Sequence, residues 1–248
     1  MAHPQETRVA IVIPTLNEAD NVRSLCEKVF LYIPDAAIIF VDDNSTDGTK
    51  EILAELAYRN GRIKPIFRQP PKSFAKSYLV GLRAALRQGA SLIIQMDADF
   101  SHDPRYLPEI LENLRDYHLV IGSRYIRGGG VKNWPWRRRF LSRAGNLFAK
   151  AMTGLKIGDL TGGFLGWQGG LLKKVLSGRL NVDGYAFLIE MKILAQEQHA
   201  KIREVPIVFV ERRQGASKMS LKIIGEAILF CCLSRLNRFR KINSRSSV

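Results

Sequence analysis

The first 130 residues alternate short runs of β-branched and other apolar side chains with longer stretches of helical periodicity. Five apolar runs have the composition of strands, and they cover Val9–Ile13, Ala37–Val41, Ile63–Phe67, Leu92–Met96 and Leu119–Gly122. Helices are expected between them, near Asp20–Tyr32, Gly48–Arg59, Ala75–Gln88 and Arg105–Asp116. Strands that are apolar throughout are typical of a parallel sheet with both faces covered. The pattern predicts a doubly wound α/β domain that binds ligands beyond the carboxyl ends of its strands.

The second half of the chain is less regular. Helical periodicity recurs in three stretches, Arg137–Thr153, Tyr185–Gln198 and Ser220–Arg240. A pair of strands is expected within Lys201–Val210, where Pro206 indicates a sheet edge or a bulge because proline cannot donate a ladder hydrogen bond. Three consecutive glycines, Gly128–Gly130, predict a flexible hinge between the two halves.

The charge of the chain is distributed unevenly. There are 38 Lys and Arg against 23 Asp and Glu, which gives a formal net charge of +15. Residues 131–248 hold 22 of the basic side chains and 7 of the acidic ones, so the whole excess lies in the second half. A local basic field of this size faces an anionic partner. The candidates are nucleic acid, an anionic membrane surface and a phosphorylated substrate.

Composition and segment lengths exclude several classes of protein. With 46% hydrophobic and 25% charged residues, the chain is globular rather than disordered or fibrous. Three cysteines are too few for a disulfide framework, which favours a reducing compartment. The polar Met1–Arg8 segment does not resemble a signal peptide, and the apolar run Ile223–Leu233 is about half of the ~20 residues that a membrane span requires. We therefore expect a protein that is soluble or bound to a membrane surface.

Acidic side chains follow two of the expected strands. Asp42 and Asp43 come at the end of the second strand, and Asp97 and Asp99 come after the fourth. Carboxylates in an Asp-x-Asp arrangement suit Mg²⁺ or Mn²⁺, whose other ligands would be diphosphate oxygens and water. A simpler interpretation is that such residues cap the next helix or turn, and Asp43 and Asp47 could do only that. Two acidic strand ends in one sheet favour the metal-dependent interpretation.

Seven segments occur in a fixed order over roughly residues 8–220. They are Ile13–Glu18, Val41–Thr49, Met96–Pro104, Ile121–Tyr125, Asp159–Phe164, Gly184–Phe187 with Glu190, and Arg212–Lys218. In these segments the chain resembles the family-two glycosyltransferases of the GT-A type, and within that family the polyprenyl-phosphate (dolichyl-phosphate) mannosyltransferases. The resemblance implies a GT-A domain, with a doubly wound and mainly parallel sheet, over residues 1–219. A basic amphipathic helix and tail over residues 220–248 would follow it.

The resemblance also implies a role for each matching residue. The donor nucleotide and its diphosphate would be bound by Pro14, Leu16, Glu18, Val41, Asp43, Asp97, Arg212 and Lys218. The ligands of the Mg²⁺ or Mn²⁺ ion would be Asp97, Asp99 and Ser101. The acceptor phosphate would be gripped by Arg124, Arg138 and Ser142. The expected catalytic residues are Asp99, Arg124 and Arg212.

The implied reaction is an inverting, metal-dependent transfer of mannose from GDP-mannose to a polyprenyl monophosphate at the cytoplasmic face of a membrane. No carboxylate base is needed, because a phosphate monoester with a second pKa near ~6 is mostly ionised at neutral pH. Arginines suit such an acceptor, since their forked donors fit phosphate. Two alternatives stay open. One is a family-two enzyme with another nucleotide sugar, such as UDP-glucose, or a saccharide acceptor; the other is a basic nucleic-acid-binding protein, although no such binding module is recognisable.

Two features depart from the family pattern. The usual Gly-Leu-Gly after a lysine is replaced by Ser73-Phe74-Ala75-Lys76 after Lys72, which bears on the mobility of this loop and on donor preference. The membrane-spanning tail of many relatives is absent, so integral anchoring is not expected. Membrane binding is expected instead from Trp134 and Trp136 and from the Ser220–Arg240 helix. Two alternatives stay open: Trp134 and Trp136 are core residues beside a solvated run of charges, Arg137–Arg139, and the Ile223–Leu233 run of the helix packs on the sheet.

Three further sites fit two roles. His102 is expected to form a local hydrogen bond rather than bind the metal. The Gly162–Gly163 pair either permits a tight turn or serves the site directly. Glu190 is either a solvated helix carboxylate or a functional one.

Overall fold

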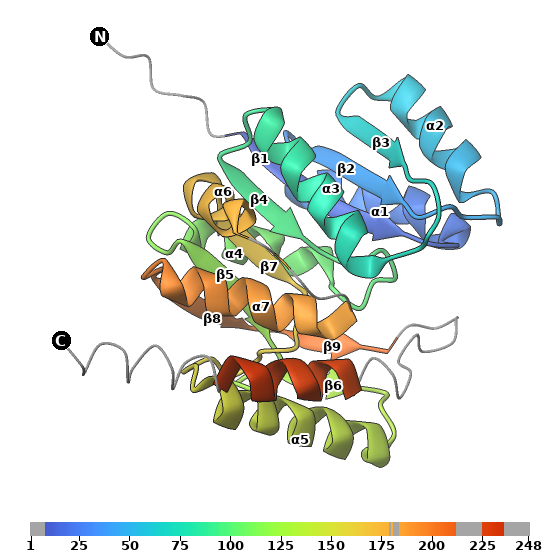
Figure 1. The fold of residues 1–248 in the computed structure, drawn as a ribbon. Helices are drawn as coiled ribbons and strands as arrows, with labels where there is room; N and C mark the ends of the chain where they lie inside the picture. The colour runs from blue at the N-terminus through green and yellow to red at the C-terminus, as the bar shows by residue number, and fades with distance from the viewer. Residues whose placement is uncertain (1–7, 179, 181–183, 212–224, 236–248) are drawn as a thin grey trace, which may run out of the picture.

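The computed structural model describes residues 8–178, 180, 184–211 and 225–235 (Figure 1). Its centre is a seven-stranded sheet with the order β3-β2-β1-β4-β7-β5-β8. These strands are β1 Val9–Thr15, β2 Ala37–Asp42, β3 Ile63–Phe67, β4 Leu92–Gln95, β5 Leu119–Ser123, β7 Leu165–Gln168 and β8 Ile202–Pro206. A separate two-stranded sheet pairs β6 (Gly130–Lys132) with β9 (Val208–Val210) in parallel. Apart from the antiparallel β7, every strand of the large sheet pairs in parallel.

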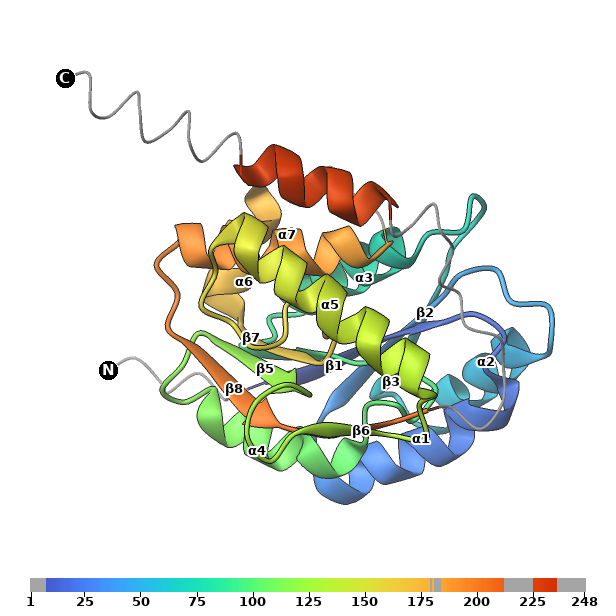
Figure 2. The same cartoon turned by 90° about the horizontal axis from the view of Figure 1, so that it is seen from below.

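Helices cover both faces of the large sheet (Figures 1 and 2). They are α1 Ala19–Tyr32, α2 Thr49–Arg59, α3 Phe74–Arg87, α4 Leu107–Asn113 after the short 3₁₀ turn Pro104–Tyr106, α5 Trp136–Thr153, α6 Gly169–Ser177 and α7 Gly184–Glu197. Alternate residues of β1 point to opposite faces, as the period of a strand requires. Ile11 and Ile13 pack with α1, α2 and α4, whereas Val12 packs with α3, α6 and α7. The predicted doubly wound α/β fold is confirmed.

The order of the strands reverses direction at β1. It runs outward through β2 and β3 on one side, and β4 then pairs with the other side of β1. In a sheet of this kind the loops at the carboxyl ends of the strands diverge at the reversal and leave a crevice for ligands. Thr15, Asp42 and the residues that follow Gln95 lie at this edge. The acidic strand ends of β2 and β4 therefore flank the strand between them.

All five strands predicted for the first half are present. The structure differs from the predictions in the second half, where β7 and α6 were not foreseen. The expected strand pair within Lys201–Val210 exists as two strands, but they do not pair with one another: β8 joins the large sheet and β9 joins β6. Pro206 is the last residue of β8, which lies at the edge of the large sheet. An edge position suits proline, because proline has no N–H to donate to a neighbouring strand.

The expected hinge at Gly128–Gly130 is wrong. Gly128 has a φ of 90°, and a Cβ atom built on Gly129 would lie 2.5 Å from the carbonyl oxygen of Ser123. Gly130 begins β6 and donates its N–H to the carbonyl of Ile207 at 2.9 Å. Gly128 and Gly129 thus form a closely packed turn that disfavours side chains, whereas a Cβ atom on Gly130 would meet no atom within 4 Å.

The C-terminal segment is partly packed and partly exposed. Residues 225–235 form a helix that runs beside α5 (Figures 1 and 2). Cys231 is buried in the core on the α7 side, whereas Leu229 and Leu233 are exposed. For the Ile223–Leu233 run, neither membrane binding alone nor packing on the sheet alone describes the helix fully, because one face is buried and another is exposed. Among the helices that the structure describes, none has the length and apolar character needed to cross a membrane.

Candidate active site

The loop after β2 is built by side chains that satisfy backbone groups. Asp42 is fully buried and accepts hydrogen bonds from the backbone N–H of Ser45 and from the hydroxyl of Thr15. Asp47 accepts from the N–H groups of Ala19 and Thr49 at 3.0 and 3.1 Å, which ties the loop to the start of α1. For Asp47 the capping interpretation is therefore correct. These contacts fix the backbone at the crevice before any ligand binds.

Asp43 has a different set of partners. Its carboxylate forms a buried ion pair with Arg68 and accepts a 2.7 Å hydrogen bond from the backbone N–H of Ser73. The Ser73 side chain in turn accepts from the N–H of Lys76 and caps α3, which begins at Phe74. The replaced Gly-Leu-Gly loop is thus anchored at Asp43 through the first turn of α3.

The other expected donor-binding residues lie along the same edge. Pro14 and Leu16 are half-buried at the end of β1. Glu18, the residue that precedes α1, donates its N–H to the hydroxyl of Thr49. Val41 differs, because its side chain is fully buried among Val12 and the residues of α3. Only the backbone of Val41 could contact a nucleotide. Arg212 and Lys218 lie outside the described residues.

The residues after β4 form the acidic part of the site. Asp97 is partly exposed, with 33% of its side chain accessible, and Asp99 accepts a 3.1 Å hydrogen bond from the N–H of Ser101. Between Asp99 and Ser101 the chain turns at Phe100, which has a φ of 60°, a conformation that is unusual for a residue with a bulky side chain. The tight turn places Asp97, Asp99 and Ser101 in one short loop.

These residues fit a divalent cation. The hydroxyl oxygen of Ser101 is buried and has no hydrogen-bond partner within the described part of the chain, although buried hydroxyls are normally satisfied. Two carboxylates and a hydroxyl are hard oxygen donors of the kind that Mg²⁺ and Mn²⁺ take. The described residues contain no cluster of three or more His, Cys, Asp or Glu that could enclose a metal. The loop therefore suits an ion that keeps ligand positions for water and phosphate.

His102 holds the backbone of this loop. Its Nδ1 accepts a 2.9 Å hydrogen bond from the N–H of Asp97, and its ring stacks on Phe164 with the centroids 4.9 Å apart. An Nδ1 that accepts a hydrogen bond carries no proton, so its 3.8 Å approach to the Asp97 carboxylate is not an ion pair. Burial lowers the pKa of His102 and outweighs the nearby carboxylates, which keeps the ring neutral. The prediction of a local hydrogen bond is confirmed.

Tyr78 lies behind Asp97. Its hydroxyl donates to Asp97 Oδ1 at 2.8 Å, and its ring is fully buried between Phe74 and Phe187. Burial raises the pKa of Tyr78 well above its usual value, and the negative charge of Asp97 adds to this effect. The phenol is thus a permanent hydrogen-bond donor to one oxygen of Asp97.

A buried charged network follows β5. The Arg124 guanidinium forms two hydrogen bonds with the Asp159 carboxylate, at 2.7 and 2.8 Å, and a third with the hydroxyl of Thr161. Burial alone would raise the pKa of Asp159, but the charge and hydrogen bonds of Arg124, together with Lys192, bring it below its usual value. Lys192 is fully buried and donates to the carbonyls of Leu160 and Gly162 at 2.8 and 2.7 Å. The amine of Lys192 therefore stabilises the backbone of the Gly162–Gly163 turn.

The two sides of the site meet at His102 and Phe209. Asp97, Asp99, Arg124 and Asp159 all act electrostatically on the buried His102 ring. The Phe209 ring lies 5.8 Å from that of His102, and the Arg124 guanidinium lies 5.5 Å from the Phe209 centroid. The expected metal ligands and Arg124 therefore belong to one site.

Arg138 and Ser142 have partners within the protein. Arg138 forms an ion pair with Glu211 and stacks over the Trp134 ring at 4.3 Å. Ser142 shares a 2.6 Å hydrogen bond with the hydroxyl of Tyr125. The interface position expected for Trp134 is wrong, since 7% of it is exposed, whereas Trp136 is 72% exposed.

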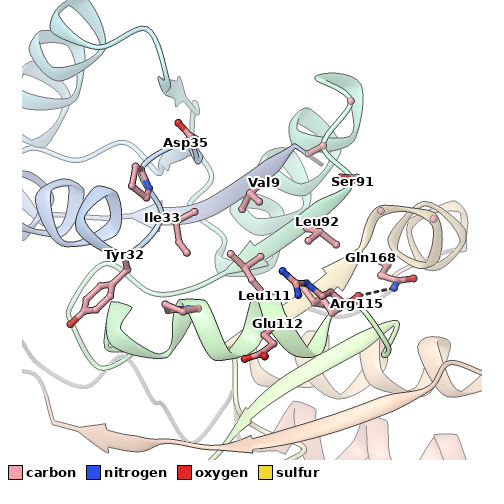
Figure 3. A pocket seen from close by; sticks show the side chains of 17 residues that line it. Val9, Tyr32, Ile33, Asp35, Ser91, Leu92, Leu111, Glu112, Arg115 and Gln168 are labelled. Carbon is pink, nitrogen blue, oxygen red and sulfur yellow. Dashed lines mark hydrogen bonds between the residues drawn. The ribbon is translucent and has the colours of Figure 1, made fainter. Parts of the chain in front are cut away.

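Another cavity lies away from this site. It has a volume of about 1150 Å³ and is lined by Val9 and Leu92, which begin β1 and β4, by Leu111 and Glu112 of α4, and by Gln168 (Figure 3). This is the amino edge of the parallel strands, whereas Asp97 follows the carboxyl end of β4. The chemistry of a doubly wound sheet takes place at the carboxyl edge, so this cavity is not the candidate active site.

Three contributors to the site were missed in the sequence. Tyr78 and Lys192 occupy buried helical positions, and such positions look like ordinary core positions in a sequence. Arg68 lies just beyond β3, where nothing in the local pattern indicates its ion pair with Asp43. Ser73 gave one signal in the sequence. Serine is a preferred N-cap, so its position predicts that a helix, α3, begins at Phe74 and carries Tyr78.

Fold and site together define an α/β protein whose crevice has carboxylates suited to a metal on one side and Arg124 on the other. The model of glycosyl transferase family 2 matches residues 10–176. The chain belongs to this glycosyltransferase family.

Comparisons with curated and solved proteins agree with this family. The chain is 36% identical over 222 residues to an undecaprenyl-phosphate mannosyltransferase of Micrococcus luteus, covering 90% of this chain and 91% of the relative. It is 37% identical over 223 residues to a polyprenol monophosphomannose synthase of Mycolicibacterium smegmatis, covering 89% and 84%. Among solved structures, glucosyl-3-phosphoglycerate synthase of Mycobacterium tuberculosis in complex with Mn²⁺, uridine diphosphate and phosphoglyceric acid has the same fold. Its TM-score is 0.66 at 18% identity, with 93% of this chain and 78% of that chain covered.

Proposed function

We propose that this enzyme transfers mannose from GDP-mannose to a polyprenyl monophosphate with inversion at the sugar, using Mg²⁺ or Mn²⁺, at a membrane surface. One observation carries the proposal: carboxylates suited to a metal and the guanidinium of Arg124 meet around His102 and Phe209. The family supports glycosyl transfer, and the names of the two curated relatives support mannose and a polyprenyl phosphate.

Asp97, Asp99 and Ser101 would hold the metal ion. When bound, the ion would neutralise the diphosphate that leaves the sugar. Tyr78 keeps one oxygen of Asp97 occupied and so fixes the orientation of the carboxylate. His102 fixes the backbone at the same residue from the other side. The loop is therefore preorganised, which lowers the cost of ordering it around a charged ligand.

The acceptor phosphate is its own nucleophile. One of its oxygens forms a bond to the anomeric carbon while the bond from that carbon to the donor diphosphate breaks. The electron pair leaves with the nucleoside diphosphate, and no proton has to move because the phosphate is already ionised near neutral pH. The protein has to place two anions in line and hold them against their repulsion. Arg124, fixed by Asp159 and Thr161, is positioned for this task.

A membrane surface is the natural location for an acceptor with a long hydrocarbon chain. Three large apolar side chains of α5 point to solvent on one face: Trp136, Phe140 and Leu147 are 72%, 71% and 68% exposed. The neighbouring helix of residues 225–235 adds Leu229, which is 61% exposed. Aromatic and aliphatic side chains beside a strongly basic segment suit the headgroup layer of an anionic leaflet. We propose peripheral binding at the cytoplasmic face through these helices.

The test is a transfer assay with labelled nucleotide sugars. Purified enzyme is incubated with GDP-mannose, UDP-glucose or UDP-mannose, with a polyprenyl phosphate or a saccharide as acceptor, and with or without EDTA. Lipid-linked mannose formed only from GDP-mannose, and lost in EDTA, supports the proposal. Transfer from another nucleotide sugar, transfer to a saccharide, or full activity in EDTA each contradicts the corresponding part. Tight binding of nucleic acid without any transfer would overturn the proposal as a whole.

A further inference from the structure

A small cavity lies between the N-terminal half of α5 and the loop after β5. Its volume is about 230 Å³, which exceeds the roughly 30 Å³ that one water molecule occupies in the liquid. It is lined by Arg124 and Tyr125 after β5, by Gly130 and Val131 of β6, and by Arg139 and Arg143 of α5. Its lining contains three arginines and no acidic side chain. The cavity has room for a tetrahedral oxyanion.

The positive charge of this cavity comes from Arg139 and Arg143. Arg124 is neutralised by its buried ion pair with Asp159. Arg138, the arginine next to Arg139 in sequence, is neutralised by Glu211. No carboxylate of the described residues lies within ion-pair distance of Arg139 or Arg143. An anion entering from solvent therefore meets two uncompensated guanidinium groups one helical turn apart.

We propose that Arg139 and Arg143 bind the phosphate monoester of the lipid acceptor in this cavity; the inference rests on the proposed function. A phosphate monoester carries a charge of about −1.5 to −2 near neutral pH, which two arginines match. A phospholipid phosphodiester carries a single charge and leaves one of the arginines uncompensated.

The position of the cavity agrees with a lipid-borne phosphate. Arg139 lies between Trp136 and Phe140 in sequence, and Arg143 precedes Leu147 by one turn. Residues three and four apart are neighbours on a helix surface, so both arginines adjoin the exposed apolar side chains of α5. A hydrocarbon chain lying along that face ends beside the cavity. Arg138 instead stabilises the end of β9 through Glu211 and Trp134.

The test compares arginines of one helix. Arg137 is exposed on α5 and does not line the cavity, so Arg137→Gln removes the same charge and serves as the matched control. The variants are Arg139→Gln, Arg143→Gln and both together. Binding of a water-soluble short-chain isoprenyl phosphate is measured by calorimetry without detergent or vesicles, with the isoprenyl alcohol as the neutral probe. Each single variant should bind about tenfold more weakly or worse, the double variant should not bind measurably, and Arg137→Gln should bind like the wild type.

The remaining arms distinguish the sources of the phosphate. Inorganic phosphate should compete with the short-chain isoprenyl phosphate, and the alcohol should not bind. Equal weakening by Arg137→Gln would show diffuse electrostatics and overturn the inference. Unchanged isoprenyl phosphate binding, together with selective loss of binding to phosphatidylglycerol vesicles in the double variant, would show a headgroup site and also overturn it. If the double variant binds and turns over the acceptor normally, the inference fails while the proposed function stands. If wild-type enzyme transfers mannose to no polyprenyl phosphate, the proposed function itself has failed.

Discussion

The hydroxyl of Tyr78 donates a 2.8 Å hydrogen bond to Oδ1 of Asp97. Tyr78 belongs to α3, and the first turn of the same helix reaches Asp43 through the backbone N–H of Ser73. A single helix thus contacts the carboxylates that follow two different strands, β2 and β4. Its rigidity sets how these two carboxylates lie relative to one another.

Replacement of Tyr78 by Phe tests this hydrogen bond. The ring keeps its packing between Phe74 and Phe187, but Asp97 loses the donor that orients it. Groups that orient metal ligands typically change affinity by about 10- to 100-fold when removed, and we expect a loss at the lower end. Mn²⁺ binding followed by electron paramagnetic resonance is the measurement. Tyr58→Phe, at a position that is 93% exposed, is the control. Equal Mn²⁺ affinity in Tyr78→Phe and the wild type would show that the hydrogen bond has no part in metal binding.

Replacement of Asp99 by Asn removes one charge without changing the volume of the side chain. We expect turnover to fall by about a hundredfold or more, because a metal contributes several kcal/mol to stabilising the leaving diphosphate. Thermal unfolding should be unchanged, since Asp99 is only half-buried. Steady-state rates with saturating GDP-mannose and Mg²⁺ give the answer. If the variant is as active as the wild type, Asp99 is not a ligand in the proposed metal site.

Lys192 should make folding stability depend on pH. Burial lowers the pKa of Lys192 from 10.5 to about 7, although Asp159 and Glu204 act in the opposite direction, while Arg124 lowers it further. Well below pH 7, Lys192 is protonated in both the folded and the unfolded state, and the full cost of the buried charge is present. Between about pH 7 and 10.5 the unfolded state binds more protons, so stability rises with pH.

Urea unfolding of the wild type and of Lys192→Met checks this prediction. The difference in the free energy of unfolding should change in favour of the wild type from pH 7 to pH 9.5, and it should stay nearly constant from pH 5 to pH 6. Titration of the exposed lysines cancels in the comparison. A difference that is independent of pH over the whole range would show that Lys192 keeps an ordinary pKa.

The apolar face of α5 should control binding to membranes. Trp136→Ser with Phe140→Ser removes two exposed aromatic rings, whose burial in the headgroup layer would otherwise favour binding. Co-sedimentation with vesicles containing phosphatidylglycerol should fall and should depend steeply on salt in the wild type. Tyr58→Ser on α2 removes a still more exposed ring from another helix and should have no effect. Equal partition of wild type into neutral and anionic vesicles would contradict electrostatic docking.

Gly81 lies where α3 crosses the sheet. A Cβ atom there would come within 2.4 Å of a Val12 methyl group and 2.9 Å of a Val41 methyl group. Gly81→Ala should therefore destabilise the protein by about 1–3 kcal/mol through overpacking. Gly145→Ala in α5 meets no atom within 4 Å and should stabilise it by about 0.5–1 kcal/mol through its helix propensity. Chemical denaturation of both variants measures the contrast, and a neutral Gly81→Ala would mean that α3 can move away from the sheet.

The sequence predicted the strands of the first half because each is a continuous apolar run, whose signal does not depend on tertiary contacts. The Leu165–Gln168 strand escaped detection because its four residues include Gly166 and a terminal glutamine, and α6 begins with two glycines. Gly166 is required there, since a Cβ atom would lie 2.6 Å from Ile110. The packing that explains this strand is visible only in three dimensions.

The candidate site likewise contains residues that the sequence could predict and residues that only the structure reveals. The acidic loop after β4 could be found from Asp97 and Asp99, because the residues that bear the chemistry are adjacent in sequence. The partners of those residues could not, since the pairs Tyr78 with Asp97, Arg124 with Asp159, and Arg68 with Asp43 are each separated by 19 or more positions. A hydrogen bond of this kind leaves no local pattern. The arginines of α5 were seen as a charged run, but only their different partners separate Arg138 from Arg139.

The antiparallel strand β7 has a consequence for the order in which the protein is assembled during synthesis. β7 pairs with β4 on one side and with β5 on the other, and no pairing joins β4 directly to β5. A nascent chain that has emerged only as far as Ser123 therefore holds β4 and β5 with unpaired edges. The gap is filled only when Gln168 has left the ribosome, and β8 follows later still. Until then the growing chain exposes apolar strand edges, which are the kind of surface that pairs with other chains before a sheet is complete.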